Sequence, residues 1–383
     1  MDQQQGIWLG LLKWSLAHSD GTAPSASTAM SGEDKMFLER VMKEMTRDEP
    51  ERMKEIMLEL VTFVDAAAAS PSAASANEGR IEGLLDELAD ITEQIDMAQV
   101  FCKFGGLQCV LSILENGSLG SEVRSTSAGV LATLSQNNLV VQDLFFAQGV
   151  VQRLSTLAVS SLASESTKTL GAKVVHSLSC SIRNHPAAEE YFSLNYGHTL
   201  LGLALPLSPP SVLSSIANLT TPNAYSTPTT VCMRRAVYLA NALLASDTRS
   251  APRLRHLLPA VVPAVFQCLA LNDLDLREGT SRLLLTIMSI PAGHATLTAS
   301  PHRETLFAAL HRRKTETLAD DEQEVHERAM ADELLALMEE GTGPSIANHV
   351  ERSAADSGPD DGDWGGAAGS SALPLMLEEN PER

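Results

Sequence analysis

The chain has 383 residues, of which 44% are hydrophobic and only 4% aromatic, a balance that favours closely packed helices over β-sandwiches. Its formal net charge of −20 excludes an ordinary nucleic-acid-binding protein, because contact with a phosphate backbone needs a basic surface. The five cysteines form no C-x-x-C pair, so we predict neither a disulfide framework nor a zinc ribbon, and we expect reduced thiols in a cytoplasmic protein.

The N-terminal third begins with an apolar run that is preceded by Asp2 and interrupted by Lys13, so it predicts neither a secretory signal nor a membrane span. We assign residues 1–32 to a flexible N-terminal segment. Apolar residues then recur every three or four positions over residues 33–65, which predicts two amphipathic helices broken near Pro50. The Ala- and Ser-rich residues 66–80 are predicted to be a linker.

From Ile81 onward the sequence repeats a plan of a polar turn, a phenylalanine, a glycine and an amphipathic helix. Phe101, Phe145 and Phe192 mark this repeat, and their separations of 44 and 47 residues match the period of armadillo and HEAT units. Gly149 is predicted to form the sharp turn between two helices of its unit. Since a longer helix precedes each marker, we predict an all-α fold, an armadillo-like α-solenoid that is a superhelix of three-helix repeats, over residues 81–342.

The later part of this domain departs from the regular plan. An insertion rich in Pro, Ser and Thr, from Pro206 to Thr227, is predicted to be a surface loop before a fourth unit. A fifth, degenerate unit follows, and then a terminal capping helix with the sequence EQEVHERAMADELLALMEE. Residues 343–383 are predicted to be a disordered acidic tail.

We find no motif for catalysis or for a cofactor: the P-loop, G-x-G-x-x-G, H-E-x-x-H and G-x-S-x-G patterns are all absent. His176 and Cys180 are i,i+4 neighbours on one side of a predicted helix. These two residues are too few to complete the coordination of a zinc ion. Catalysis by the cysteine would need a third group that orients the histidine as its base. We therefore predict no catalytic residue, no metal site, no cofactor and no enzymatic activity, and keep a Cys/His enzyme only as an alternative.

Several stretches, spread over residues 11–340, together resemble one family. They are LLKWSLAHS, DEPERMKEIMLELV, DELADITEQIDMAQVFCKFGGL, LSQNN, SLSCSIRNHPAAEEYFSLNYG and MRRAVYLANALL. The chain resembles the Fes-type nucleotide exchange factors, armadillo proteins that bind chaperones of the heat-shock-70 (Hsp70) class. The resemblance implies a co-chaperone that binds the ATPase domain of a cytosolic Hsp70 chaperone, accelerates ADP release and so promotes client release.

The resemblance also implies the residues that would contact this partner. Ala98 in the first unit and Arg235 in the fourth match family positions implicated in chaperone contact, although a surface ion pair is the ordinary alternative for an exposed arginine. Asn137, Asn138 and Asn184 lie at repeat corners, where helix capping is favoured over partner contact. The family's N-terminal release segment, which would enter the chaperone's substrate-binding domain, corresponds here to a stretch with four large apolar residues: Trp8, Leu11, Leu12 and Trp14.

Two alternatives remain. The N-terminal segment could instead pack on the protein's own solenoid, as an apolar stripe most often does. The chain could also be an armadillo adaptor without exchange activity. Such an adaptor would need tryptophans within the solenoid, but all three tryptophans of this chain lie outside the predicted solenoid. We expect a monomer with neither a nucleic acid nor a membrane as partner.

Overall fold

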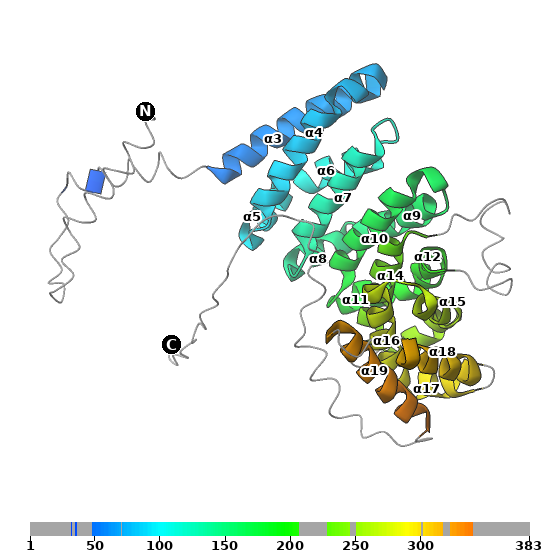
Figure 1. The fold of residues 1–383 in the computed structure, drawn as a ribbon. Coiled ribbons are helices and arrows are strands. Elements are labelled where there is room, and N and C mark those ends of the chain that lie inside the picture. Colours follow the sequence, from blue (N-terminus) through cyan, green and yellow to red (C-terminus); the bar gives the residue numbers. More distant parts are fainter. Residues whose placement is uncertain are drawn as a thin grey trace. The chain divides into compact units, whose positions relative to one another are not determined.

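The computed structural model describes residues 32, 35–36, 48–69, 71–206, 228–245, 250–299, 302–316 and 322–339. The chain divides into two units, residues 1–341 and 342–383, and every described residue belongs to the first. The release segment, residues 207–227 of the insertion and the acidic tail lie outside the described residues. The described part contains helices and no strand (Figure 1), which confirms the all-α prediction.

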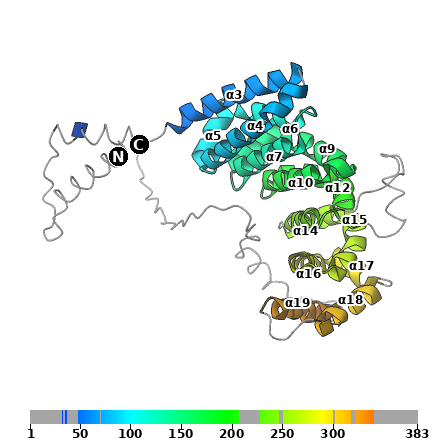
Figure 2. The same ribbon diagram turned by 45° about the horizontal axis from the view of Figure 1, so that its top comes forward.

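Six long helices pack against one another in chain order, and we call this series the ladder. They are α4 (Pro71–Thr92), α7 (Ser121–Ser135), α10 (Lys168–Ile182), α14 (Thr230–Ala245), α16 (Leu274–Ser289) and α19 (Glu322–Glu339). Figure 2 shows α10, α14, α16 and α19 as successive layers. Each ladder helix therefore buries one side against the helix before it and another against the helix after it, as in a repeat protein.

Shorter helices join the ladder helices and complete the three-helix units. A short first helix follows α4, α7, α10 and α16, and a second helix then returns to the next ladder helix. The first helices are α5 (Ile95–Lys103), α8 (Leu139–Ala147), α11 (Pro186–Phe192) and α17 (Pro291–Thr298); the second are α6 (Gly106–Glu115), α9 (Val150–Leu162), α12 (His198–Ala204), α15 (Ser250–Ala270) and α18 (His302–Glu316). The fourth unit departs from this plan, because its described residues form only α14 and α15. The described part is thus an armadillo-like α-solenoid.

The marker phenylalanines, and the glycines that follow them in the sequence, are explained by burial, by backbone conformation or by close packing. Phe101, Phe145 and Phe192 are completely buried. Gly149 has φ +72°, in the left-handed region that favours glycine, so the predicted turn is confirmed. The third unit differs, because α11 continues through the π-helical turn η2 (Ser193–Gly197) into α12 without a left-handed residue. Gly197 packs closely there: a Cβ atom would lie 2.6 Å from Cδ2 of Leu257, so a larger residue would require the leucine side chain to shift.

The predicted linker at residues 66–80 is wrong, because helices α3 (Glu49–Ala69) and α4 pass through it. Alanine has the highest helix propensity, and Pro71 occupies the first position of α4, where its missing N–H costs nothing. Asp48 is not helical and Pro50 lies in the first turn of α3, so the predicted helix boundary near Pro50 is confirmed. The other predicted amphipathic helix lies outside the described residues, apart from Lys35 and Met36, which are helical.

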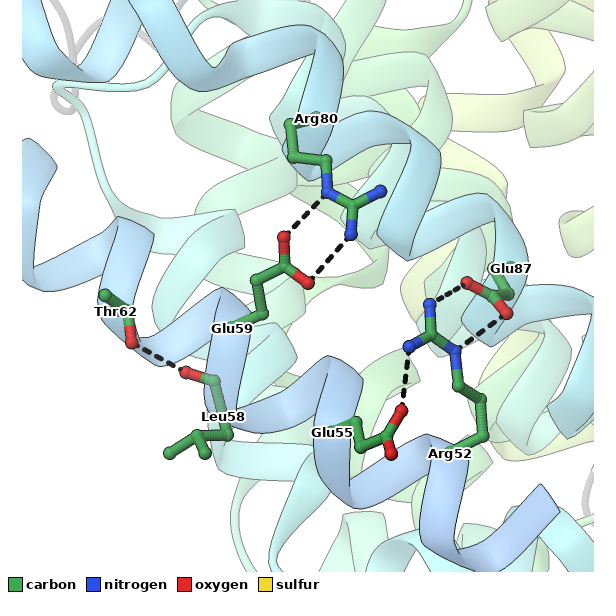
Figure 3. A network of polar contacts seen from close by, with 7 residues as sticks. All are labelled: Arg52, Glu55, Leu58, Glu59, Thr62, Arg80 and Glu87. Atoms are coloured by element: carbon green, nitrogen blue, oxygen red, sulfur yellow. Dashed lines mark hydrogen bonds and ion pairs between the residues drawn. The ribbon is translucent and has the colours of Figure 1, made fainter. Parts of the chain in front are cut away.

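Two arginine–glutamate pairs join α3 to α4 (Figure 3). Arg80 donates from Nε and Nη2 to the carboxylate of Glu59, at 2.7 and 2.8 Å. Arg52 binds Glu87 in the same two-pronged way, at 3.0 and 2.7 Å, and also reaches Glu55 on its own helix. Because a planar guanidinium matches a carboxylate in this geometry, these pairs fix the register of the N-terminal hairpin.

The predicted capping helix is confirmed as α19, which packs on α16 and α18. Its inner side carries Glu327, whose carboxylate accepts hydrogen bonds from Nε and Nη2 of Arg277 at 2.8 and 3.0 Å. Both side chains are buried, with 7% of Arg277 and 2% of Glu327 exposed. No single helix within the described ranges is long and apolar enough to span a membrane; α5 and α6 pass that test together by length and composition, across an 83° bend.

Candidate partner-binding surface

The outward sides of the ladder helices form one surface, which we call the ladder face. Residues spaced three or four apart lie on the same side of a helix, and on each ladder helix one such row stays at least partly exposed. We define the ladder face by its charged and aromatic members: Glu82, Asp86, Asp90, Glu122, Lys173, His176, Arg183, Arg234, Arg235, Tyr238, Glu278 and Arg282.

The N-terminal end of the ladder face is acidic. Glu82, Asp86 and Asp90 follow one another at intervals of four on α4, and Glu122 lies on the next ladder helix. Burial, and then the charge of Glu122, raise the pKa of Glu82 above its usual value. Burial, and then the charge of Asp90, raise the pKa of Asp86. Like charges therefore gather here, and a basic partner surface would relieve their repulsion.

The middle of the ladder face, on α10 and α14, is basic. It presents Lys173, Arg183, Arg234 and Arg235 in a chain whose formal net charge is −20. Arg234 is engaged internally, since it binds both carboxylate oxygens of Asp273, at 3.0 and 2.6 Å, and lowers the pKa of that carboxyl group. The other three cations give this region its positive character.

Arg235, a predicted contact residue, lies on α14 and is partly buried. Its Nη1 donates a hydrogen bond to the backbone carbonyl of Ala172 on α10, at 3.0 Å. The guanidinium therefore joins two neighbouring ladder helices while part of the side chain remains accessible. This position is compatible with partner contact and adds a structural role that the sequence pattern did not indicate.

Ala98, the other residue implied by the resemblance, lies in the core. Only 1% of it is exposed, so its methyl group does not form part of a partner surface. Aligned on the marker phenylalanines, Ala98 corresponds to Gln142 and Glu189, which are also buried. Gln142 donates to the backbone carbonyl of Arg183 at 3.1 Å, so this position of the repeat anchors α8 against the C-terminal end of α10. The prediction of direct contact is thus replaced by one of packing.

The three corner asparagines separate into two groups. Asn138 caps α8: its Oδ1 accepts from the N–H of Val141 at 3.4 Å, and its Nδ2 donates to the carbonyl of Ile95 at 3.2 Å. The capping prediction is confirmed for this residue. Asn137 and Asn184 are instead left-handed, with φ +54° and +65°.

The cap of α11 comes from the residue after Asn184. Nδ1 of His185 accepts from the N–H of Ala188 at 3.0 Å, and its Nε2 lies 3.0 Å from Oδ1 of Asp143. A neutral imidazole protonated on Nε2 satisfies both contacts. The predicted cap by Asn184 is therefore wrong, because Asn184 supplies the left-handed turn and His185 the acceptor.

The His176–Cys180 pair gains no support as a chemical site. The Sγ of Cys180 lies 4.0 Å from Nε2 of His176, but only 1% of Cys180 is exposed. No group of three or more metal-binding side chains occurs among the described residues. Burial raises the pKa of two thiols elsewhere in the solenoid, to about 11 for Cys102 and about 12 for Cys268, so those two thiols are poor nucleophiles.

One feature of the ladder face escaped sequence reasoning altogether. The guanidinium carbon of Arg183 lies 4.8 Å from the centre of the Tyr238 ring, and Nη1 of Arg183 donates to the Tyr238 hydroxyl. The two residues are 55 positions apart, so no local pattern indicates that they meet. The sequence offered one indirect indication of their importance, because Arg183 and Tyr238 both lie in stretches on which the family resemblance depends.

Two family models match adjacent parts of the chain. The model described as "Nucleotide exchange factor Fes1" matches residues 9–100, and the model described as "SIL1/FES1/HPBP1 C-terminal domain" matches residues 97–204. Together they cover about half of the chain, from the release segment to α12. The repeated helices define an armadillo-like α-solenoid protein with a charged ladder face. The chain belongs to the Fes1-type nucleotide exchange factor family.

Individual relatives agree with the family models. Hsp70-binding protein 1 of Mus musculus is 28% identical over 200 residues, which are 51% of this chain and 54% of the relative. The Homo sapiens protein of the same name is 27% identical over the same length. The chain thus spans about half the length of the curated relatives it matches. A designed armadillo repeat protein is similar in structure, with a TM-score of 0.45 and 13% identity over 66% of this chain and 92% of its own.

Proposed function

We propose that this protein binds the ATPase domain of a cytosolic Hsp70 chaperone and accelerates release of ADP from it. The main support is the match of the Fes1 and C-terminal family models over residues 9–204, which include the first three ladder helices. The charge pattern of the ladder face suits a protein partner with its own charged surface. The protein would act without enzymatic chemistry of its own.

The mechanism we infer is a coupling of two binding equilibria. If the ladder face binds the open, nucleotide-poor form of the ATPase domain more tightly than the closed, ADP-bound form, it lowers the affinity for ADP by the same factor. Each tenfold loss of ADP affinity requires about 1.4 kcal/mol of preference for the open form. ATP then rebinds and the client is released. No side chain of the factor needs to touch the nucleotide.

Two parts of the chain have separate roles in this proposal. Arg235 would contact the ATPase domain from the basic middle of the ladder face, while its bond to Ala172 keeps α10 and α14 in register. The release segment, with Trp8, Leu11, Leu12 and Trp14, would enter the substrate-binding domain of the chaperone. It lies outside the described residues, and the Fes1 model match begins at residue 9, so three of these four residues fall within the match.

The test is stopped-flow measurement of labelled ADP leaving a cytosolic Hsp70 chaperone from the same organism. The full chain is expected to accelerate release, and Arg235→Ala to weaken this effect about tenfold, as the loss of an interface hot spot does. Arg153→Ala is a matched control, because Arg153 lies on α9 and binds Glu115, away from the ladder face. Unchanged ADP release with the full chain would refute the proposal.

The same assay separates the alternatives. An adaptor without exchange activity would bind the ATPase domain yet leave the rate of ADP release unchanged. Cys180→Ala is expected to retain full exchange activity. Loss of activity with the helices still folded would favour a role for the His176–Cys180 pair.

A further inference from the structure

The Arg183–Tyr238 pair is preorganised on the ladder face. Arg183 ends α10 and Tyr238 lies on α14, so the pair bridges two neighbouring ladder helices. The guanidinium carbon lies 4.8 Å from the ring centre, in the range of a cation–π contact, and Nη1 donates to the hydroxyl of the same tyrosine. Both side chains are partly buried. The ring therefore holds the guanidinium in one orientation before any partner arrives.

Arg183 differs from other arginines of the solenoid in what it binds. Arg52, Arg153 and Arg234 each hold a carboxylate in a two-pronged geometry. Within the described ranges, no carboxylate lies within ion-pair distance of Arg183. Its Nε–H is buried and has no hydrogen-bond partner there either. In a chain with 48 acidic and 28 basic residues, a guanidinium whose immediate neighbours include no carboxylate points to an acceptor from outside.

The surroundings of the pair favour an acidic partner group. Lys173 on α10 and Arg235 on α14 add charge of the same sign to this part of the ladder face. A guanidinium binds a carboxylate through parallel N–H groups, and an outside carboxylate would meet the terminal Nη groups of Arg183, because its Nε is buried. Arginine and tyrosine are also enriched among interface hot spots, and a prefixed side chain loses less conformational entropy on binding.

We propose that Arg183 binds a carboxylate on the surface of the partner protein and that Tyr238 positions it for this contact. This inference rests on the proposed function, in which the partner is the ATPase domain of an Hsp70 chaperone. It specifies that the part of the ATPase domain facing α10 and α14 carries an acidic side chain. Arg183 is the contact residue, and Tyr238 acts through it.

The test measures the affinity of the full chain and its variants for the isolated ATPase domain at several salt concentrations. Arg183→Ala is expected to weaken binding about tenfold, and Arg183→Glu to weaken it further through repulsion. Affinity of the unaltered chain should fall with added salt more steeply than that of Arg183→Ala, because one charge pair is lost. Tyr238→Phe keeps the ring and removes the hydroxyl that accepts from the guanidinium, so we expect a smaller loss, of about threefold, because the ring still positions Arg183.

A double variant and two controls make the result decisive. If Tyr238 acts through Arg183, the double variant Arg183→Ala/Tyr238→Phe binds no more weakly than Arg183→Ala alone. Arg153→Ala controls for removal of an exposed arginine, and thermal unfolding of each variant shows whether the solenoid is intact. A merely structural role would lower the unfolding temperature and leave the salt dependence of binding unchanged, which would overturn the inference.

The outcomes also separate this inference from the proposed function. If the full chain accelerates ADP release and Arg183→Ala and Arg183→Glu bind as tightly as it does, the inference fails and the proposed function stands. If the full chain neither binds the ATPase domain nor accelerates release, the proposed function itself fails.

Discussion

Asparagine serves the same backbone purpose at two corners of the solenoid. Asn137 and Asn184 both have positive φ values, and both directly precede the residue that caps the next helix. Asparagine and glycine tolerate this left-handed conformation, whereas a residue with an ordinary Cβ loses roughly 1–2 kcal/mol there. Both asparagines are exposed, so the structure alone leaves room for a partner contact as well.

Substitution of Asn184 separates these two roles. We expect Asn184→Gly to keep both stability and chaperone binding, because glycine adopts the left-handed conformation freely and retains the N–H that donates to Oε1 of Glu189 at 2.9 Å. Asn184→Ala should cost about 1 kcal/mol of unfolding free energy, measured by urea denaturation. Weaker binding by Asn184→Gly with unchanged stability would identify the side chain as a contact instead.

For single residues, the sequence predicted roles that depend on local contacts and missed roles that depend on contacts between repeats. The cap by Asn138 is local, since its partner is three residues away, and it was predicted. The burial of Ala98 and the meeting of Arg183 with Tyr238 depend on which repeat packs against which. Such contacts join residues 41 to 63 positions apart, so a pattern within one helix cannot indicate them.

Among the elements, the ladder helices were easier to predict than the joints between them. The marker phenylalanines and the helical period located most repeats, because buried apolar residues must recur on one face. The Ala- and Ser-rich residues 66–80 were mistaken for a linker, since low sequence complexity outweighed the helix propensity of alanine. Gly197, the glycine of the third unit, does not form a left-handed turn as Gly149 does, but packs closely against Leu257.

The buried pair between α16 and α19 gives a prediction about the C-terminal cap. Arg277→Met would leave Glu327 as a buried charge without its partner, at a cost of about 3 kcal/mol. The double variant Arg277→Met/Glu327→Leu should recover most of this loss, because two apolar side chains replace both charges. Hydrogen exchange of the α19 amides measures the effect locally, which suits a repeat protein that need not unfold in one step.

The matched control for this pair is another arginine of the same helix. Arg282 binds Glu278, but 40% of its side chain is exposed, so Arg282→Ala should change protection of α19 by no more than about 0.5 kcal/mol. Equal protection of α19 in Arg277→Met and the unaltered protein would contradict the assigned role of the buried pair.

At the scale of the whole molecule, the family models end at residue 204, but the packing does not. Helix α10 packs on α14, and α12 packs on α14 and α15. A buried ion pair crosses the same boundary: Oε2 of Glu189 on α11 lies 2.7 Å from Nη1 of Arg253 on α15, with 3% and 2% of the two side chains exposed. The residues beyond the family match therefore complete the core of the third unit.

A chain shortened to residues 1–206 is accordingly expected to lose its folded state and aggregate. Removal of α14 and α15 uncovers the sides of α10 and α12 that they bury, and leaves the carboxylate of Glu189 without Arg253. Solenoids need a terminal repeat with a polar outer face, and this shortened chain would have none. Light scattering coupled to gel filtration should show aggregates, whereas a chain of residues 1–341, which keeps α19, should match the full protein in mass distribution and unfolding temperature. If the shortened chain were monomeric with an unchanged unfolding temperature, the first three units would be self-sufficient, and the C-terminal half would be required only for binding through α14 and α16.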